Sequence, residues 1–241
     1  MSKTLVKSAF TIGLLVLLMT VPVYGASVNK SISVEAGSES DGESSVNGSI
    51  SVGEGATVTG SLNTVNGKIR VDENSKIESA STVNGSVKLY DNVTAHSLET
   101  VNGSVSVGEG GKVSGEVEAV NGGISLETGT VVSGNVSNVN GSIELEGSEV
   151  GGNISTVAGS VNLSDASVVK GDIIIEKPSM WSFGNKNDKL PEVVIGPGSV
   201  VEGNIVLERE VKLYISETAE VGGVEGKMSM SDAVRFSGDH P

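Results

Sequence analysis

Asparagine recurs within the tripeptide Val-Asn-Gly about every 18 or 19 residues, so its side-chain amide could form hydrogen bonds from one repeat to the next. In a stacked repeat, each amide can donate to the amide oxygen of the next, at about 1 kcal/mol per step. We therefore predict that these asparagines form a structural ladder at a corner of the fold. Four of them also match the N-glycosylation sequon, and we interpret these matches as by-products of the repeat. The members are Asn29, Asn47, Asn66, Asn84, Asn102, Asn121 and Asn140.

Carboxylates form a second column, one per repeat, and could bind a cation. Its members are Glu54, Glu73, Asp91, Glu109 and Asp165, with Glu127 and Glu146 displaced by one position. Stacked about 4.8 Å apart, neighbouring carboxylates repel by about 1 kcal/mol in water, and Ca²⁺ would relieve the repulsion. The favoured interpretation is a solvated ridge that blocks lateral aggregation, because the glycine-rich calcium-binding nonapeptide is absent.

Histidine and arginine offer little for catalysis. His96 and His240 are the two histidines, and no Ser-His-Asp set or histidine-based metal cluster can be built around them. Arg70, Arg209 and Arg235 are far apart in the repeat, which argues against a lyase with an arginine base. A hexapeptide acyltransferase, which uses a histidine, is the enzyme alternative, but its small inward residues are replaced here by Ile, Val and Leu. We therefore predict a protein that is not an enzyme and needs no cofactor.

Residues 176–192 interrupt the repeat and hold the most unusual composition of the chain. The segment contains the only tryptophan, Trp181, and also Phe183, in a chain that is 3% aromatic. Lys177, Lys186 and Lys189 lie beside them. Two interpretations stay open: a loop that packs back on the fold, or a partner contact, since exposed loop aromatics often anchor interfaces.

The elements that position these columns follow from the repeat itself. In residues 46–64, aliphatics open three sides of about six residues, and short alternating runs such as Ile50-Ser51-Val52 read as half-buried strands. Glycines two residues after the first aliphatic of sides one and three mark corners. The pattern predicts an all-β, three-sided parallel β-helix of about ten coils, with the valines of Val-Asn-Gly in its core.

A coil of this size cannot fold alone, which explains the repetition. About six small aliphatics contribute roughly 1.5–3 kcal/mol each on burial, whereas ordering one coil costs about 27 kcal/mol. Stacked coils share a core and satisfy one another's backbone groups at a spacing of about 4.8 Å. Ten coils at that spacing predict a rod about 48 Å long.

Composition limits where the chain acts. Residues 1–25 read as a signal peptide, with Lys3 and Lys7 before an apolar run from Ala9 to Met19 that is too short to span a bilayer. The exported form would carry 14 basic and 30 acidic residues, a net charge of −16, so a nucleic-acid partner is not expected. No cysteine is present, which excludes disulfides, thiolate metal sites and a lipoprotein anchor. We place the β-helix at 26–225, with a degenerate first coil at 26–45, and a covering tail at 226–241.

Two motifs of the repeat resemble those of known bacterial families: Val-Asn-Gly-Ser-Ile-Ser-Val at 46–52 and Val-Glu-Gly-Asn-Ile-Val-Leu at 201–207. Over about residues 28–225 the chain resembles the bactofilins, which are polymer-forming bacterial cytoskeletal proteins, and an exported β-strand-repeat family of putative adhesins. The resemblance implies a right-handed β-helix and self-association through the coil ends. The chain differs from bactofilins in its signal peptide and its long loop.

Together these features predict a non-catalytic scaffold or adhesin-like rod of the cell envelope, periplasmic or on the surface. Its partner would be a second copy at the coil ends or an envelope component. The alternative is a Ca²⁺- or partner-binding module that uses the acidic column and the loop with Trp181 and Phe183.

Overall fold

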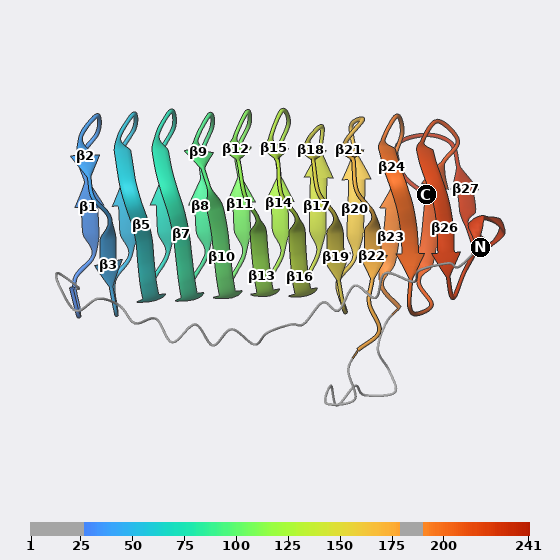
Figure 1. Cartoon of the computed structure of the whole chain (residues 1–241), viewed down its shortest axis with the longest axis horizontal. Helices are drawn as coiled ribbons and strands as arrows, with labels where there is room; N and C mark the ends of the chain where they lie inside the picture. Colours follow the sequence, from blue (N-terminus) through green and yellow to red (C-terminus); the bar gives the residue numbers. More distant parts are fainter. Residues whose placement is uncertain (1–26, 179–189) are drawn as a thin grey trace, which may run out of the picture.

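The structure, a computed structural model, describes residues 27–178 and 190–241. These residues form a β-solenoid of about ten coils in which neighbouring strands are parallel, with one 3-10 helix, η1 (Met230–Asp232), near the end (Figure 1). The predicted all-β parallel repeat and its coil count are therefore confirmed.

One side of the rod is an 11-stranded sheet to which each coil adds one short strand. Its strands, in spatial order, are β1 (Ile32–Val34), β4 (Ile50–Val52), β6 (Ile69–Val71), β8 (Val87–Leu89), β11 (Val105–Val107), β14 (Ile124–Leu126), β17 (Ile143–Glu146), β20 (Val161–Ser164), β23 (Glu192–Ile195), β25 (Lys212–Ser216) and β27 (Val234–Phe236). We call the outward surface of this sheet face one.

The other two sides belong to one 16-stranded sheet, because in some coils a single strand runs through both. Strands that cover both sides are β5 (Thr57–Asn66), β7 (Lys76–Asn84), β24 (Val200–Leu207) and β26 (Glu220–Gly226). Side two otherwise consists of β2 (Glu39–Ser40), β9 (Thr94–Ala95), β12 (Lys112–Val113), β15 (Val131–Val132), β18 (Glu149–Val150) and β21 (Val168–Val169). Side three otherwise consists of β3 (Glu43–Ser45), β10 (Ser97–Asn102), β13 (Val117–Asn121), β16 (Val136–Asn140), β19 (Ile154–Thr156) and β22 (Ile173–Ile175).

The core runs along the axis of the rod and is filled by small aliphatic side chains. In register, Ile69 pairs with Val87, and Val71 with Leu89, and all four are fully buried. The residues between them, Arg70 and Lys88 among others, point outward, as a strand's alternation requires. Each coil therefore adds a layer to one continuous hydrophobic core.

The valines of Val-Asn-Gly are not core residues, so that part of the prediction is wrong. Val65 is half-buried and Val101 is 36% exposed, whereas the residue before each, Thr64 and Thr100, is buried. The reason is alternation within one strand: Leu62 points inward, so Thr64 does as well and Val65 points out. The tripeptide therefore ends side three and does not open side one.

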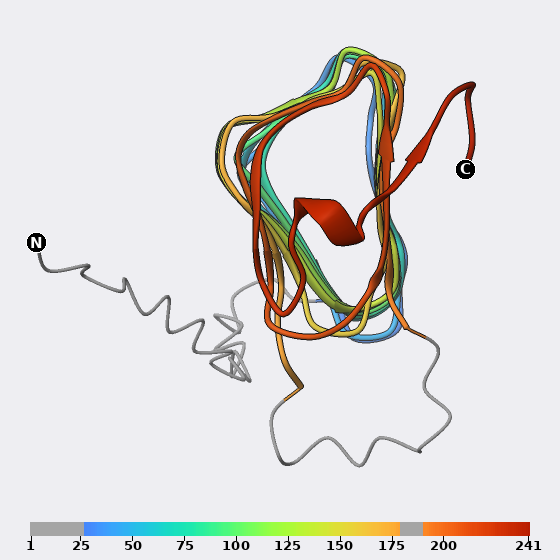
Figure 2. The ribbon, with the colours of Figure 1, turned by 90° about the vertical axis from the view of Figure 1, so that its right-hand side faces the viewer.

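The two ends of the rod differ from its middle. In the first coil, Ser40 and Glu43 occupy positions that Val58 and Leu62 fill in the next coil, and the Ser40 hydroxyl donates to Glu43 at 2.9 Å. At the other end, η1 lies across the opening of the last coil (Figure 2), and Met228 packs against the core. A polar coil therefore closes one end and an apolar lid closes the other.

Candidate functional site

The asparagine column forms a continuous hydrogen-bonded ladder on the surface of the rod. Each Nδ2 donates to the Oδ1 of the preceding coil at 2.8–3.0 Å, and the side chains are exposed. The ladder joins Asn29, Asn47, Asn66, Asn84, Asn102, Asn121 and Asn140. Every amide in the middle uses one donor and one acceptor on its neighbours, so this column holds the corners in register.

The glycine of the same corner brings the backbones of adjacent coils together. A Cβ added at Gly85 would overlap the carbonyl oxygen of Gly67 in the coil below. The buried threonines complete the corner, because the Thr82 hydroxyl donates to that same carbonyl at 3.0 Å. Thr64 and Thr100 do the same for Gly48 and Gly85, so buried carbonyl groups at these corners keep a partner.

A second ladder, which sequence reasoning missed, joins side two to side three. Here the side chain of one coil accepts from a backbone N–H of the next: Asn135 Oδ1 from Asn153 N, and Asn153 Oδ1 from Asp172 N, both at 2.9 Å. Asn204 N donates to Asp172 at 2.8 Å, and Asn135 Nδ2 donates to Glu116 at 2.9 Å. The available signal was a polar residue after glycine in four successive coils, at positions 135, 153, 172 and 204.

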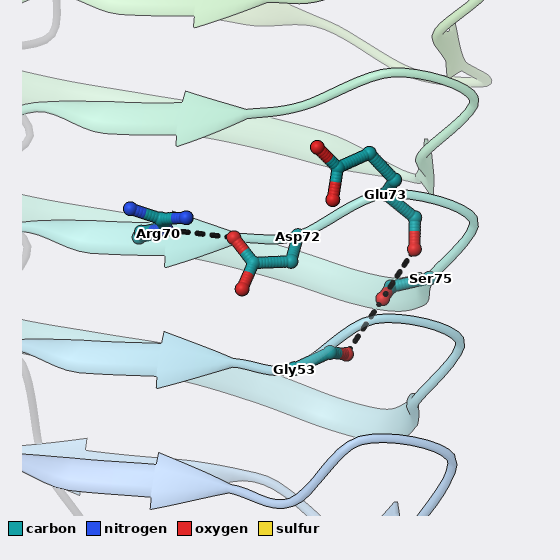
Figure 3. Close-up of polar contacts among 5 residues, drawn as sticks. All are labelled: Gly53, Arg70, Asp72, Glu73 and Ser75. Atoms are coloured by element: carbon teal, nitrogen blue, oxygen red, sulfur yellow. Dashed lines mark hydrogen bonds and ion pairs between the residues drawn. The ribbon is translucent and has the colours of Figure 1, made fainter.

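The acidic column lies at the corner between sides one and two. In the second coil, Gly53 to Ala56 forms a turn closed at 3.2 Å, and Gly55 has a φ of 68°. Figure 3 shows the same corner one coil further, where no marked contact reaches the Glu73 carboxylate and the buried Ser75 hydroxyl donates to Gly53 O at 3.0 Å. The turns of successive coils are hydrogen-bonded to one another, for example Gly55 N to Glu73 O and Asn74 N to Asp91 O, both at 3.0 Å, so the column places one acid in each coil.

No group of three or more His, Asp or Glu side chains in residues 27–178 and 190–241 is placed to hold a metal ion. One carboxylate of the column already has a backbone partner, because Asp91 accepts from the Glu109 N–H at 3.1 Å. Among the described residues of the acidic column, therefore, no three side chains are arranged as a multidentate Ca²⁺ site.

Face one carries a cluster of cations beside a tyrosine. Arg70 Nε lies 2.6 Å from Asp72 Oδ1 (Figure 3), and this hydrogen bond and charge raise the pKa of the guanidinium. The Arg70 guanidinium and the Lys88 ammonium each lie 4.5 Å from the centre of the Tyr90 ring. Cation–π contacts of this kind fix the direction of two long, exposed side chains.

The two histidines are not brought together. His96 Nδ1 lies 2.9 Å from Ser114 Oγ on the exposed corner after side two, and no carboxylate is hydrogen-bonded to this ring. Arg209 and Arg235 instead donate to backbone carbonyls, those of Val157 and Ser216. Among the described residues, these side chains therefore make structural contacts and form no acid–base constellation.

A groove of about 590 Å³ lies on face one, beside residues 190–192 and the C-terminal tail. Its floor holds Glu144, Asn162 and Val194, the outward residues of β17, β20 and β23. Its lining is completed by Ser142, Ala158, Ser160, Val161, Leu190, Pro191, Glu192, His240 and Pro241. Sequence reasoning missed the groove because the tail returns to these strands only in the folded chain.

The interrupting segment leaves the rod at the corner that Val-Asn-Gly occupies elsewhere. Ile175 pairs with Thr156, and Glu192 follows in the position of Ser160, so the register resumes on face one. Glu176, at the exit, has its pKa raised by burial and then by the charge of Glu208. Trp181 and Phe183, the predicted partner contacts, lie outside the described residues.

In comparisons with known proteins, no family model, curated protein or solved structure matches the chain. Within the described part of the chain, no helix is long and apolar enough to cross a membrane.

Proposed function

We propose that the protein is an exported, non-catalytic rod of the cell envelope that acts as a scaffold or adhesin. The filled interior carries the proposal: in the described coils most inward positions hold buried aliphatic side chains, and the buried hydroxyls of Thr64, Ser75 and Thr82 are bonded to the backbone. Fully buried side chains occupy the space between the sheets in the described coils, so we expect partners to meet outer faces and corners. The exposed His96–Ser114 pair lacks an acid that would orient the ring for nucleophilic catalysis.

The two closed ends support a rod of fixed length. Inward-pointing charge in an edge coil, such as Glu43 here, disfavours pairing with another strand edge. At the other end, η1 occupies the surface on which a further coil would stack. Light scattering over a concentration series tests this point. We expect a particle that stops growing, and continuous elongation with concentration would contradict the closed ends.

Export can be tested by determining the N-terminus of the protein isolated from the cells that naturally produce it. We expect mass spectrometry of the envelope or secreted fraction to find a chain that begins at Ala26. An intact N-terminus in the cytosolic fraction would contradict export and, with it, the envelope role.

The interrupting segment is the proposed partner contact, and the register offers a matched control. Deleting residues 178–190 and changing Pro191 to Gly leaves four residues between Ile175 and Val193, as residues 157–160 lie between Thr156 and Val161. Glycine is needed because a Cβ at the equivalent Gly159 would overlap the Gly141 carbonyl. We expect this variant to keep the melting temperature of the parent.

A pull-down from envelope extract then compares the parent, the shortened variant and Trp181→Ala/Phe183→Ala. We expect a component retained by the parent and lost by both variants. Equal retention by all three would place the partner contact elsewhere on the rod.

A further inference from the structure

The central outward column of face one has charges of opposite sign in its two halves, although each half also carries a charge of the other sign beside that column, Asp72 in the first and Lys212 in the second. The outward residue of each successive strand lies in one straight column, set by the register of the sheet. From the first coil onward the column reads Ser33, Ser51, Arg70, Lys88, Ser106, Ser125, Glu144, Asn162, Val194 and Tyr214. The cations lie before the middle of the rod and the carboxylate lies after it.

The column is complementary to itself when one copy is turned end for end. A two-fold axis in the plane of face one, between Ser106 and Ser125, places Lys88 of one copy opposite Glu144 of the other, and Arg70 opposite Asn162. The two central serines face each other. Because the operation is two-fold, each of these contacts occurs twice, as an isologous interface requires.

The neighbouring columns bring no like charges together. The same axis places Lys68, beside Arg70, opposite Ser160, and Tyr90 opposite Glu146. Arg70 and Lys88 of one copy would enter the groove of the other, whose floor holds Glu144 and Asn162. Tyr90 lies 4.5 Å from both cations and fixes their direction, so less side-chain entropy is lost on association.

The area is sufficient for a stable pair. Face one is about ten coils long, or about 48 Å, and five residues wide, or about 16 Å. Contact over this whole surface, in which the tail residues His240 and Pro241 beside the groove would have to take part, would bury at most about 770 Å² per copy and about 1,500 Å² in total, which is within the range of specific interfaces. At physiological salt the Debye length is about 8 Å, so the net negative charges of two rods are screened while short contacts persist.

We propose that face one is a self-recognition surface on which two copies of this chain pair side by side and antiparallel. The pairing does not depend on export, and it differs from end-to-end growth because it stops at two copies. Its basis is the opposition of Lys88 and Arg70 to Glu144 and Asn162 across the middle of the sheet.

Sedimentation equilibrium of the purified protein at physiological salt tests the proposal by charge exchange. Lys88→Glu and Glu144→Lys each bring like charges together at two equivalent contacts, and each should raise the dimer dissociation constant at least about tenfold. The double variant Lys88→Glu/Glu144→Lys restores opposite charges and should recover most of the parent affinity. Lys76→Glu is the matched control, because Lys76 is exposed on side two and makes the same change in net charge as Lys88→Glu.

Thermal melting of each variant separates lost pairing from lost folding, since all three side chains are exposed. A parent that stays monomeric at every concentration would overturn the proposal, and would leave the cations as a site for some other anionic partner. Equal weakening by Lys76→Glu, or a double variant that pairs no better than the single ones, would overturn it as well.

Discussion

Two corners of the rod use glycine for different reasons. At the Val-Asn-Gly corner, Gly85 is needed because the Gly67 carbonyl of the coil below occupies the place of a Cβ. At the acidic corner, the space around Gly55 is open, but its φ of 68° lies in the left-handed region. The first corner is constrained by its neighbouring coil and the second by its own backbone.

This difference between the corners explains which residues replace glycine in other coils of the repeat. At the acidic corner, Asn74 and Asn92 replace glycine with φ values of 59° and 57°, and asparagine tolerates this region. At the Val-Asn-Gly corner no side chain can be accommodated in that way. Contact between coils is therefore the stronger constraint on the sequence.

The largest expected effect is that of Gly85→Ala, which tests the contact between coils. The added methyl group would force two coils apart in the middle of the rod, and we expect a loss of about 3 kcal/mol or more in the free energy of unfolding. Urea denaturation followed by circular dichroism measures it. A loss below about 1 kcal/mol would mean that adjacent coils separate easily.

The next largest loss in the free energy of unfolding is expected for Asn153→Ala, which tests the difference between the two ladders. The substitution leaves the partly buried N–H of Asp172 without its acceptor, which should cost about 1–2 kcal/mol. Asn84→Ala is the control, since it removes only exposed amide-to-amide bonds that water replaces, and should cost less than about 1 kcal/mol. Equal losses would contradict the distinction between backbone-linked and side-chain-linked ladders.

Gly55→Ala tests the corner that is limited by its own backbone. A left-handed conformation costs an L-residue about 1 kcal/mol, and nothing lies near the new methyl group. Gly55→Asn should cost less, since the chain already uses asparagine there at Asn74 and Asn92. Melting temperatures in the order parent, Asn variant, Ala variant would agree with this account, and the reverse order would not.

The smallest effect concerns Glu118, on side three between the two ladders. Burial raises the pKa of this carboxyl, and Glu99 and Glu116 raise it further. The folded state therefore binds the proton more tightly than the unfolded state, and this contribution to stability is lost as pH rises from the ordinary glutamate range through the raised pKa. Glu118→Gln should stabilise the protein at neutral pH by less than about 1 kcal/mol, with little change in acid.

Melting curves at several pH values measure this difference, with Glu217→Gln on the exposed surface as a charge-matched control. An equal gain in stability from both variants would show that the change in net charge causes the stabilisation and that the surroundings of Glu118 do not.

The asparagine ladder and the stacked coils could be predicted from the sequence because both depend on the period. When identical residues recur once per coil, a parallel stack places them one above another whatever the details of the turn. The second ladder has the same geometry, but its members alternate among Asn, Asp and Glu, so its period is less visible.

The orientation of each valine could not be predicted in the same way. Val65 and Thr64 are adjacent, and which one points inward depends on where the strand through Leu62 ends. A shift of one residue exchanges core and surface, so spacing between repeats leaves the choice open. The threonine lies inside because its hydroxyl satisfies the Gly48 carbonyl, a partner that belongs to the neighbouring coil.

The sequence by itself determined the repeat, the parallel β-solenoid, its number of coils and the columns of like residues, because these follow from period and alternation. Tertiary structure alone decided the groove between tail and sheet, the closed ends, and the opposition of charges along face one. Those features join residues from distant coils, such as Glu144 and His240, and no local pattern specifies their contact.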